Sequence, residues 1–307
     1  MKTILVTGAS GFLGSRIVMG LLDKGYSIVA SCRNSDSLKS IKHKNIKVIE
    51  YDFEDSIYHL EKEIDEIDAI CHLAAYIPKN LEDYRLAEKC FKINALGTLN
   101  LLEMSNLIKI KHFIYYSAGN AYELSNNPAT EDDKLYPSFK APYYLSSKIV
   151  GEIYVDHYKQ NGLINATILR VSAPYGVAMS RNSFVYKCIN NLSQSKKINI
   201  YNNDIYKTDF VFVDDIVKAT LNCIENEIYG VFNVGSGKSF SLAQAAKIIA
   251  KILNKSEDLV KIAPVNNTTN IFKGFSALDM KKTESIIGII PTNLEAGLKK
   301  MIEEMDI

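Results

Sequence analysis

The sequence has almost no net charge and no long apolar run. Its 36 Lys and Arg residues oppose 35 Asp and Glu residues, which leaves +1 over 307 residues and gives no electrostatic basis for binding nucleic acid or an anionic membrane. No apolar stretch approaches the roughly 18 residues that span a bilayer, and the chain opens on a strand pattern where a secretory leader would be basic and then apolar. We therefore expect no membrane or nucleic-acid partner and a cytoplasmic location.

Cysteine is scarce, and its spacing matches neither a zinc site nor a disulfide framework. The five residues are an odd number without any Cys-x-x-Cys pair, so we expect reduced, mostly buried thiols and no metal. They are Cys32, Cys71, Cys90, Cys188 and Cys223. Internal repeats and low-complexity linkers are also lacking. A chain of 307 residues can bury the core of two modest domains or of one α/β unit with an appended lobe.

A phosphate-binding turn is predicted at the N-terminus. Residues 2–6 form a short apolar, β-branched run that is typical of a buried strand, and they lead directly into Thr7-Gly8-Ala9-Ser10-Gly11-Phe12-Leu13-Gly14. Gly8 allows a tight turn, Gly11 lets a pyrophosphate approach the backbone, and Gly14 lets a helix at 15–24 pack on the strand. Because the first N–H groups of that helix would face the anion, the turn predicts a dinucleotide site.

Strand patterns alternate with helical patterns along the first half of the chain. This alternation predicts an α/β fold, a Rossmann-type doubly wound parallel sheet with helices on both faces. The expected strands are 26–31, 46–51, 67–72, 112–116 and 165–171, and the expected long helices are 84–108 and 144–161.

The alternation weakens after residue 176, where a smaller lobe is expected. Helices at 184–194 and 214–226 and strands at 198–201, 209–213 and 231–234 indicate that the chain leaves the sheet and returns to it. We assign residues 1–171 to the dinucleotide-binding domain, with 210–234 returning to it. A C-terminal substrate-binding lobe would then comprise 172–209 and 235–307.

A tyrosine and a lysine are spaced to share one helix face. Tyr144 and Lys148 are four residues apart within the predicted helix 144–161. Lys148 would lower the pKa of Tyr144 by favouring the phenolate, so that Tyr144 exchanges a proton with a substrate hydroxyl. Tyr143 is excluded, since the residue four positions on is Ser147. The alternative is a Tyr-Lys pair on the surface.

Ser117 follows the predicted strand 112–116, at the sheet edge where α/β proteins bind ligands. Its hydroxyl would donate a hydrogen bond to the reacting oxygen. The alternative is a turn serine that bonds its own backbone.

Several short motifs, taken with the glycine turn, resemble the NAD-dependent epimerase/dehydratase family of extended short-chain dehydrogenases/reductases. They are Asp52-Phe53, His72-Leu73-Ala74-Ala75, Asn94-Ala95-Leu96-Gly97-Thr98, Tyr175-Gly176, 209–215 and 232–237. The resemblance implies that Ser117, Tyr144 and Lys148 are catalytic. It also implies that Asp52 and Phe53 flank adenine, that Leu73, Ala74 and Ala75 pass beside the cofactor, and that Asn94 lies near the lysine.

The same resemblance implies a substrate class and an assembly. Members of the family act chiefly on nucleotide sugars, which favours a 4-epimerase or a 4-ketosugar reductase. In this family the helices that correspond to 84–108 and 144–161 pair across a homodimer. His72 alone is better interpreted as a packed histidine than as a catalyst.

The chain departs from the family pattern at three places. Thr208, beside Lys207, stands where an arginine commonly clamps the pyrophosphate, and a second arginine is lacking in 271–275. Ser117-Ala118-Gly119 replaces the Thr-Asp-Glu run of the dehydratases, so a 4,6-dehydratase is not expected. Two alternatives stay open, a reductase of a non-nucleotide carbonyl and a cofactor-sensing binding protein without catalysis. The Tyr144 and Lys148 pair argues against the second.

The end of the second strand indicates which dinucleotide is used. An acidic residue that binds the adenosine ribose is usual there, but this chain has Cys32 followed by Arg33. A 2′-phosphate would meet a guanidinium, so NADP is preferred over NAD. The alternative is that Arg33 stacks on adenine or points to solvent.

Overall fold

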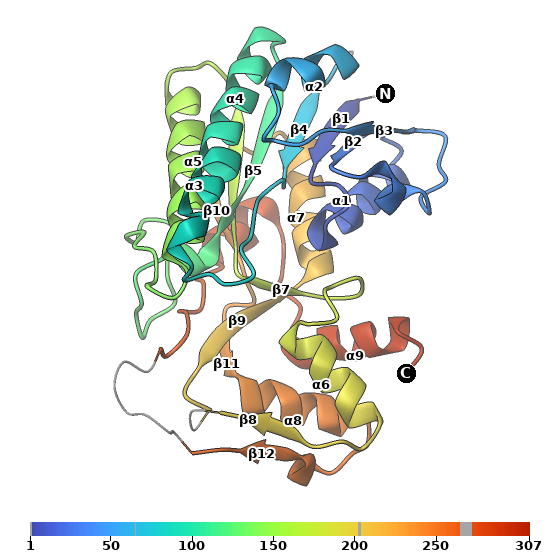
Figure 1. The fold of residues 1–307 in the computed structure, drawn as a ribbon, viewed down its shortest axis with the longest axis vertical. Coiled ribbons are helices and arrows are strands. Elements are labelled where there is room, and N and C mark those ends of the chain that lie inside the picture. Colours follow the sequence, from blue (N-terminus) through green and yellow to red (C-terminus); the bar gives the residue numbers. More distant parts are fainter. Residues whose placement is uncertain (1, 65, 202–203, 265–271) are drawn as a thin grey trace.

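A computed structural model describes residues 2–64, 66–201, 204–264 and 272–307 (Figure 1). A seven-stranded sheet forms its upper half, with strand order β10-β6-β5-β4-β1-β2-β3 and every neighbouring pair parallel. The strands are β1 (Thr3–Thr7), β2 (Ser27–Cys32), β3 (Ile46–Glu50), β4 (Ala69–His72), β5 (His112–Ala118), β6 (Ala166–Val171) and β10 (Gly230–Val234). The predicted α/β class with a Rossmann-type parallel sheet is confirmed.

Helices cover both faces of this sheet. On one face α1 (Phe12–Asp23) packs against α7 (Val213–Glu225), and on the other α4 (Gly97–Leu107) packs against α5 (Pro142–Gln160) and α2 (Ile57–Glu63) (Figure 1). Successive side chains of β1 point to opposite faces of the sheet. Ile4 and Val6 belong to the core beneath α1, whereas Leu5 belongs to the core beneath α4. Burial on both faces explains the nearly continuous apolar runs of the strands.

The helical run predicted at 84–108 is present, but it is not one regular helix. A 3-10 turn (Tyr84–Leu86), α3 (Ala87–Cys90) and a π turn (Phe91–Leu96) precede α4. In the π turn the Gly97 N–H donates to the Lys92 carbonyl, five residues back. The wider turn accommodates the buried Asn94, whose contacts are described below.

The lower half has its own small sheets and its own core. A three-stranded sheet comprises β7 (Ala173–Tyr175), β9 (Lys207–Phe212) and β11 (Ser239–Ser241), and β8 (Ile198–Ile200) pairs with β12 (Val260–Ile262). The helices of this half are α6 (Phe184–Ser193), α8 (Leu242–Ile252) and α9 (Leu294–Glu304), with a 3-10 turn at Glu257–Leu259. In the upper half, 3-10 turns follow β2 at Ser35–Leu38 and β5 at Gly119–Ala121, and a π turn at Thr283–Ile287 packs on α7 and β10. The strand predicted at 231–234 joins the central sheet as β10, whereas that at 209–213 joins the small sheet as β9.

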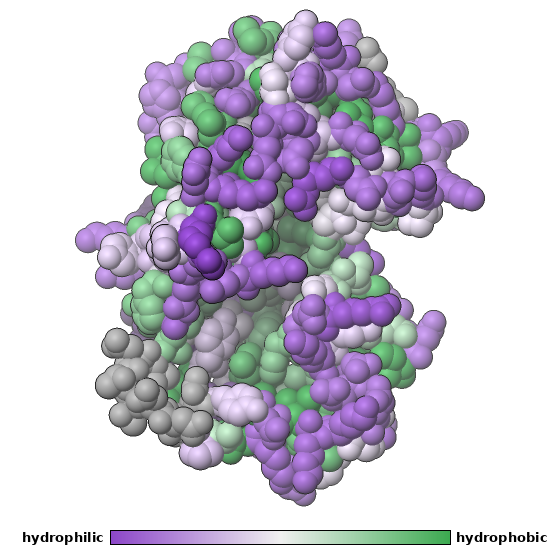
Figure 2. Space-filling view, in the orientation of Figure 1, coloured by the Kyte–Doolittle hydropathy of each residue, from purple (hydrophilic) through white to green (hydrophobic). Residues whose placement is uncertain are grey.

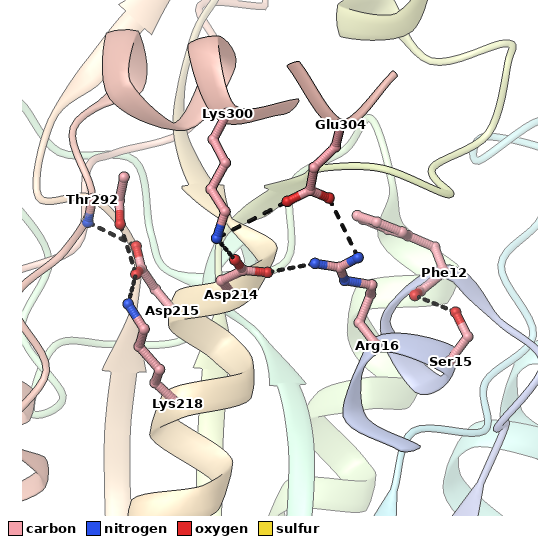
Figure 3. Close-up of polar contacts among 9 residues, drawn as sticks. All are labelled: Phe12, Ser15, Arg16, Asp214, Asp215, Lys218, Thr292, Lys300 and Glu304. Carbon is pink, nitrogen blue, oxygen red and sulfur yellow. Dashed lines mark hydrogen bonds and ion pairs between the residues drawn. The ribbon is translucent and has the colours of Figure 1, made fainter. Parts of the chain in front are cut away.

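Charged side chains join helices of the two halves (Figure 3). Asp214, at the start of α7, accepts hydrogen bonds from Arg16 on α1 and from Lys300 on α9. The Glu304 carboxylate lies 3.6 Å from Arg16 Nη1 and 4.0 Å from Lys300 Nζ, so these four side chains form one network of ion pairs. Beside it, Asp215 accepts from both the backbone and the hydroxyl of Thr292.

All five cysteines are buried and unbridged, as expected. Among the described residues, His, Cys, Asp and Glu side chains form no cluster of three that could hold a metal ion. None of the helices in the described ranges combines the length and the apolar character needed to cross a bilayer.

Candidate active site

A cavity of about 590 Å³ opens at the carboxyl ends of β1, β4, β5 and β6. It lies in the hollow between the two halves of the molecule (Figure 2). The lining includes each predicted site residue except Asn94, namely Gly8, Ser10, Gly11, Phe12, Leu13, Gly14, Arg33, Asp52, Phe53, Leu73, Ala74, Ala75, Ser117, Tyr144 and Lys148. The fold therefore brings segments that are far apart in sequence to one place.

The glycine turn is shaped by two close backbone contacts. Gly8 has a φ of +67°, and a Cβ there would lie 2.8 Å from the backbone nitrogen of Ala74. A Cβ on Gly14 would lie 2.2 Å from the carbonyl oxygen of Gly8. The N-cap of α1 is Gly11, which offers no side-chain cap, so no cap from the described residues competes with an anion for the first N–H groups of the helix.

His72 is a structural residue that supports the segment beside the glycine turn. Its Nδ1 lies 2.8 Å from the hydroxyl of Thr7, which also accepts from the backbone N–H of Ala74. Its Nε2 lies 3.0 Å from the hydroxyl of Thr98. Burial and the nearby Lys148 charge lower the pKa of His72 well below its usual value, so the ring is neutral. This agrees with the interpretation as a packed histidine.

Asn94 is buried but does not line the cavity. Its Oδ1 accepts from the Tyr76 backbone N–H at 2.6 Å, and its Nδ2 donates to the Tyr76 carbonyl at 3.0 Å and to the Ser147 hydroxyl at 2.9 Å. All the polar atoms of the amide are thus used within the protein. Asn94 links the segment after β4 to α5, one residue before Lys148.

Tyr144 and Lys148 face the cavity from the first turns of α5. The Lys148 ammonium lies 4.0 Å from the centre of the Tyr115 ring. Burial lowers the pKa of Lys148 to about 7, and the charge of Glu152 opposes this effect. Burial, together with Cys90, raises the pKa of Tyr144 to about 12. The expected lowering by Lys148 is therefore wrong for this state, because burial disfavours the charged phenolate.

Ser117 lies near the end of β5, and its Oγ is buried without a hydrogen-bond partner in the described part of the chain. Two other serines that line the cavity, Ser31 and Ser172, have buried Oγ atoms in the same condition. Buried hydroxyls nearly always have partners. Three unpartnered ones around one cavity fit a polar ligand, and with the glycine turn they fit a dinucleotide.

Comparison with known proteins identifies the family. The model of the NAD dependent epimerase/dehydratase family matches residues 4–235. The chain belongs to this family.

Individual relatives share nearly the whole chain. The putative UDP-glucose 4-epimerase of Methanocaldococcus jannaschii is 28% identical over 98% of this chain and 98% of its own. The dTDP-D-glucose 4,6-dehydratase of Homo sapiens is 27% identical over 98% of this chain and 89% of its own. The UDP-glucose 4-epimerase of Thermotoga maritima, solved with UDP-glucose, is 26% identical and has a TM-score of 0.85, covering 99% and 98% of the two chains. The UDP-glucuronic acid 4-epimerase of Bacillus cereus, solved with UDP-glucuronic acid and NAD, has a TM-score of 0.86 at 24% identity over 99% of each chain and shows the shared fold.

At the end of β2 the position that is acidic in many NAD-binding members of such folds is Cys32. Its buried thiol donates to the Asn34 carbonyl at 3.3 Å. Arg33 lines the cavity, is exposed and makes no ion pair within the described ranges. Glu50, the register partner of Cys32 on β3, accepts from the Ser35 N–H at 2.7 Å. That carboxylate is engaged by the loop after β2.

The two places where the family's arginines are lacking lie side by side. Lys207 forms an isolated bridge with Gly274, and its backbone bonds both Lys273 and Phe275. Lys207 and Lys273 are exposed and have no ion-pair partner among the described residues. Residue 271, at the start of the second departure, lies outside the described residues. Thr208 is buried whereas its strand neighbour Lys207 is exposed, so the two side chains face opposite sides of β9, and neither Lys207 nor Lys273 is among the residues that line the cavity.

Sequence reasoning missed several residues of the cavity wall. Ser172, Ala173 and Pro174 line it directly after β6, and Tyr76 and Ile77 line it after β4. Their positions at the carboxyl ends of predicted strands were the available signal. No local pattern distinguishes them from other loop residues, because their exposure to the cavity depends on the packing of the lower half.

Proposed function

We propose that the protein is an NAD(P)-dependent nucleotide-sugar epimerase or 4-ketosugar reductase that transfers hydride at a sugar carbon. One observation carries the proposal: Ser117, Tyr144 and Lys148 line the same cavity as the glycine turn. In this proposal residues 1–171 bind the dinucleotide, with 210–234 returning to that domain through α7 and β10, and 172–209 with 235–307 bind the substrate. The catalytic side chains and the glycine turn that binds the cofactor would then lie together at the carboxyl edge of the central sheet.

Each side chain has a distinct part in the proposed reaction. The bound dinucleotide supplies or accepts the hydride. Tyr144 exchanges the hydroxyl proton, and its pKa of about 12 means that it is protonated at neutral pH, ready to donate to an oxygen that gains charge as hydride arrives. Lys148 contacts the cofactor ribose, and the unpartnered Oγ of Ser117 donates to the reacting oxygen. His72 takes no part, since its ring atoms are used within the protein.

The substrate's diphosphate would be bound by lysine instead of arginine. Lys207 and Lys273 are adjacent, exposed and unpaired in the described structure. Ammonium groups attract phosphate as point charges but lack the planar fork of a guanidinium. The absence of these arginines also favours a second candidate function, the reduction of a carbonyl substrate that carries no nucleotide.

NADP is the proposed dinucleotide, although the family is described by NAD and the Bacillus cereus structure contains NAD. Arg33 supports the choice, because this residue lines the cavity where a 2′-phosphate would be bound and its guanidinium makes no ion pair with the described residues. The carboxylate of Glu50 is turned to the Ser35 N–H, and Cys32 carries no charge.

A homodimer is proposed through the outer faces of α4 and α5 and the turns before them. Phe91, Leu96 and Ile153 are exposed on these elements, at 50%, 42% and 58% of their surface. Apolar side chains on the π turn and on the adjacent α5 suit an isologous interface in which the same patch pairs with its copy.

The decisive experiment is incubation of the purified protein with UDP-, dTDP- and GDP-sugars and with 4-keto sugars, each with NAD and with NADPH. Product analysis detects an epimer, and loss of nicotinamide absorbance detects reduction. Conversion of a nucleotide sugar supports the proposal. Reduction of simple carbonyls alone favours the second candidate, and cofactor binding without any conversion would point to a binding protein.

A further inference from the structure

A third ionisable residue follows Tyr144 and Lys148 on the same face of α5. Glu152 lies four residues after Lys148, as Lys148 lies four residues after Tyr144, so the three side chains rise along one stripe of the helix. Lys148 and Glu152 are only 3% and 5% exposed. Buried charged side chains are costly, so they are usually paired with another group or serve a function.

The Glu152 carboxylate is fixed by one partner at one of its two oxygens. Oε1 accepts from Nε and Nη2 of Arg170 on β6, at 2.9 and 2.6 Å. The Nη1 of Arg170 donates to the Tyr122 hydroxyl at 2.7 Å and to the Glu131 carbonyl at 2.8 Å. Oε2 is buried and has no hydrogen-bond partner in the part of the chain that the structure describes. The pair thus leaves one carboxylate oxygen uncompensated.

The Lys148 ammonium has little else to stabilise its charge. Within the described ranges it makes no hydrogen bond or ion pair and lies over the Tyr115 ring. The ionisable groups around it are Tyr144 and Glu152 on α5, Tyr115 on β5 and the neutral His72 on β4. Of these groups, Glu152 is the carboxylic acid, and its Oε1 is bonded to the Arg170 guanidinium, the other charged group at this position.

We propose that Glu152 is a positioning residue whose carboxylate, held by Arg170, keeps Lys148 protonated from a position one helical turn further along α5. The proposal rests on the proposed function, in which a charged Lys148 binds the cofactor ribose. Without Glu152 a buried ammonium would face only aromatic rings and a neutral imidazole, and it would lose its proton at neutral pH.

The test observes Lys148 directly and needs no turnover. Protein containing lysine labelled with ¹³C at Cε is titrated by NMR, and the Lys148 signal is assigned by its loss in Lys148→Met. In Glu152→Gln we expect the titration midpoint of Lys148 to fall by on the order of one pH unit, because a nearby charge has been removed. Asp156→Asn removes a carboxylate one turn further along α5, where the side chain is partly exposed, and should leave the midpoint nearly unchanged.

The direction of the shift separates this role from a merely structural one. A loosened core would hydrate Lys148 and raise its midpoint toward the ordinary lysine value, so an unchanged or raised midpoint in folded Glu152→Gln overturns the proposal. If that variant does not fold, Glu152→Asp keeps the charge but withdraws it by one methylene, and the midpoint must still fall. Lack of turnover with every sugar would count against the proposed function and leave this result standing.

Discussion

Arg16 and Asp214 lie 198 residues apart in the chain, and the Arg16 Nη2 is 2.8 Å from the Asp214 Oδ1. Asp214 also accepts from Lys300 on α9 (Figure 3). One carboxylate thereby connects the helix that follows the glycine turn with the last helix of the chain. Both halves of the molecule contribute to the orientation of the proposed phosphate-binding turn.

Asp214→Asn should destabilise the protein by about 1–3 kcal/mol at pH 7, the range for hydrogen bonds to a charged group. Burial alone would raise the pKa of Asp214, but the bonds from Lys300 and Arg16 outweigh it and lower the pKa. A depressed folded-state pKa gives stability above the unfolded value near 4 that is lost as pH falls through the folded value. Urea unfolding at pH 7 and below pH 4 should show the difference between wild type and variant shrink in acid.

Lys299→Met is the matched control for this network. Lys299 is the exposed neighbour of Lys300 on α9 and makes no ion pair in the described structure. Its loss should change the unfolding free energy by less than about 0.5 kcal/mol. A comparable loss of stability in Lys299→Met and Lys300→Met would show that the network contributes nothing specific.

Tyr144→Phe should lower turnover by about 10²–10⁴-fold, the usual contribution of a general acid or base, and leave cofactor affinity nearly unchanged. The phenol hydroxyl serves proton transfer in the proposed mechanism and binding only weakly. Tyr143→Phe, one residue earlier on α5, should retain wild-type turnover because its helical position does not pair it with Lys148. Wild-type turnover in Tyr144→Phe would remove this residue from the mechanism.

Lys148→Met should weaken cofactor binding and turnover together, each by about tenfold or more, because one ammonium is assigned both roles. Burial lowers the pKa of Lys148 to about 7, so wild-type cofactor affinity should decline as pH rises above 7 and the ammonium loses its proton. Affinity measured by calorimetry between pH 6 and 9 should be flat in Lys148→Met. A flat wild-type profile would mean that the cofactor does not contact the charged form.

Local sequence signals predicted those parts of the site that depend on neighbouring residues. The structure contains the predicted strand before Gly8, and it places Tyr144 and Lys148 on one helix as their four-residue spacing predicts. Each of these features depends only on residues close together in the sequence. The high pKa of Tyr144 was not predictable in this way, because it depends on burial by other segments. The Arg170 contact to Glu152 likewise joins β6 to α5, and neither segment's pattern specifies it.

The proposed dimer predicts that a charge in the patch on α5 dissociates it. Ile153→Glu should convert a dimer into a monomer of 34.4 kDa at micromolar concentration, since an unpaired carboxylate would be buried at the interface. Ile290, 85% exposed and outside these helices, gives the control, and Ile290→Glu should stay dimeric. Light scattering measures both, and a monomeric wild type would refute the assembly.

The choice of dinucleotide turns on Arg33. Arg33→Ala should weaken NADP by about ten- to a hundredfold, as expected for the loss of a charged hydrogen bond, and should leave NAD almost unchanged because NAD has no 2′-phosphate. Arg33→Lys keeps the charge but not the planar fork, so NADP affinity should lie between those of wild type and Arg33→Ala. Titration of the three proteins with both cofactors gives the six dissociation constants that this comparison needs. Equal losses for NADP and NAD would show that the guanidinium stacks on adenine, and a wild type that favours NAD would show that Arg33 does not recognise the phosphate.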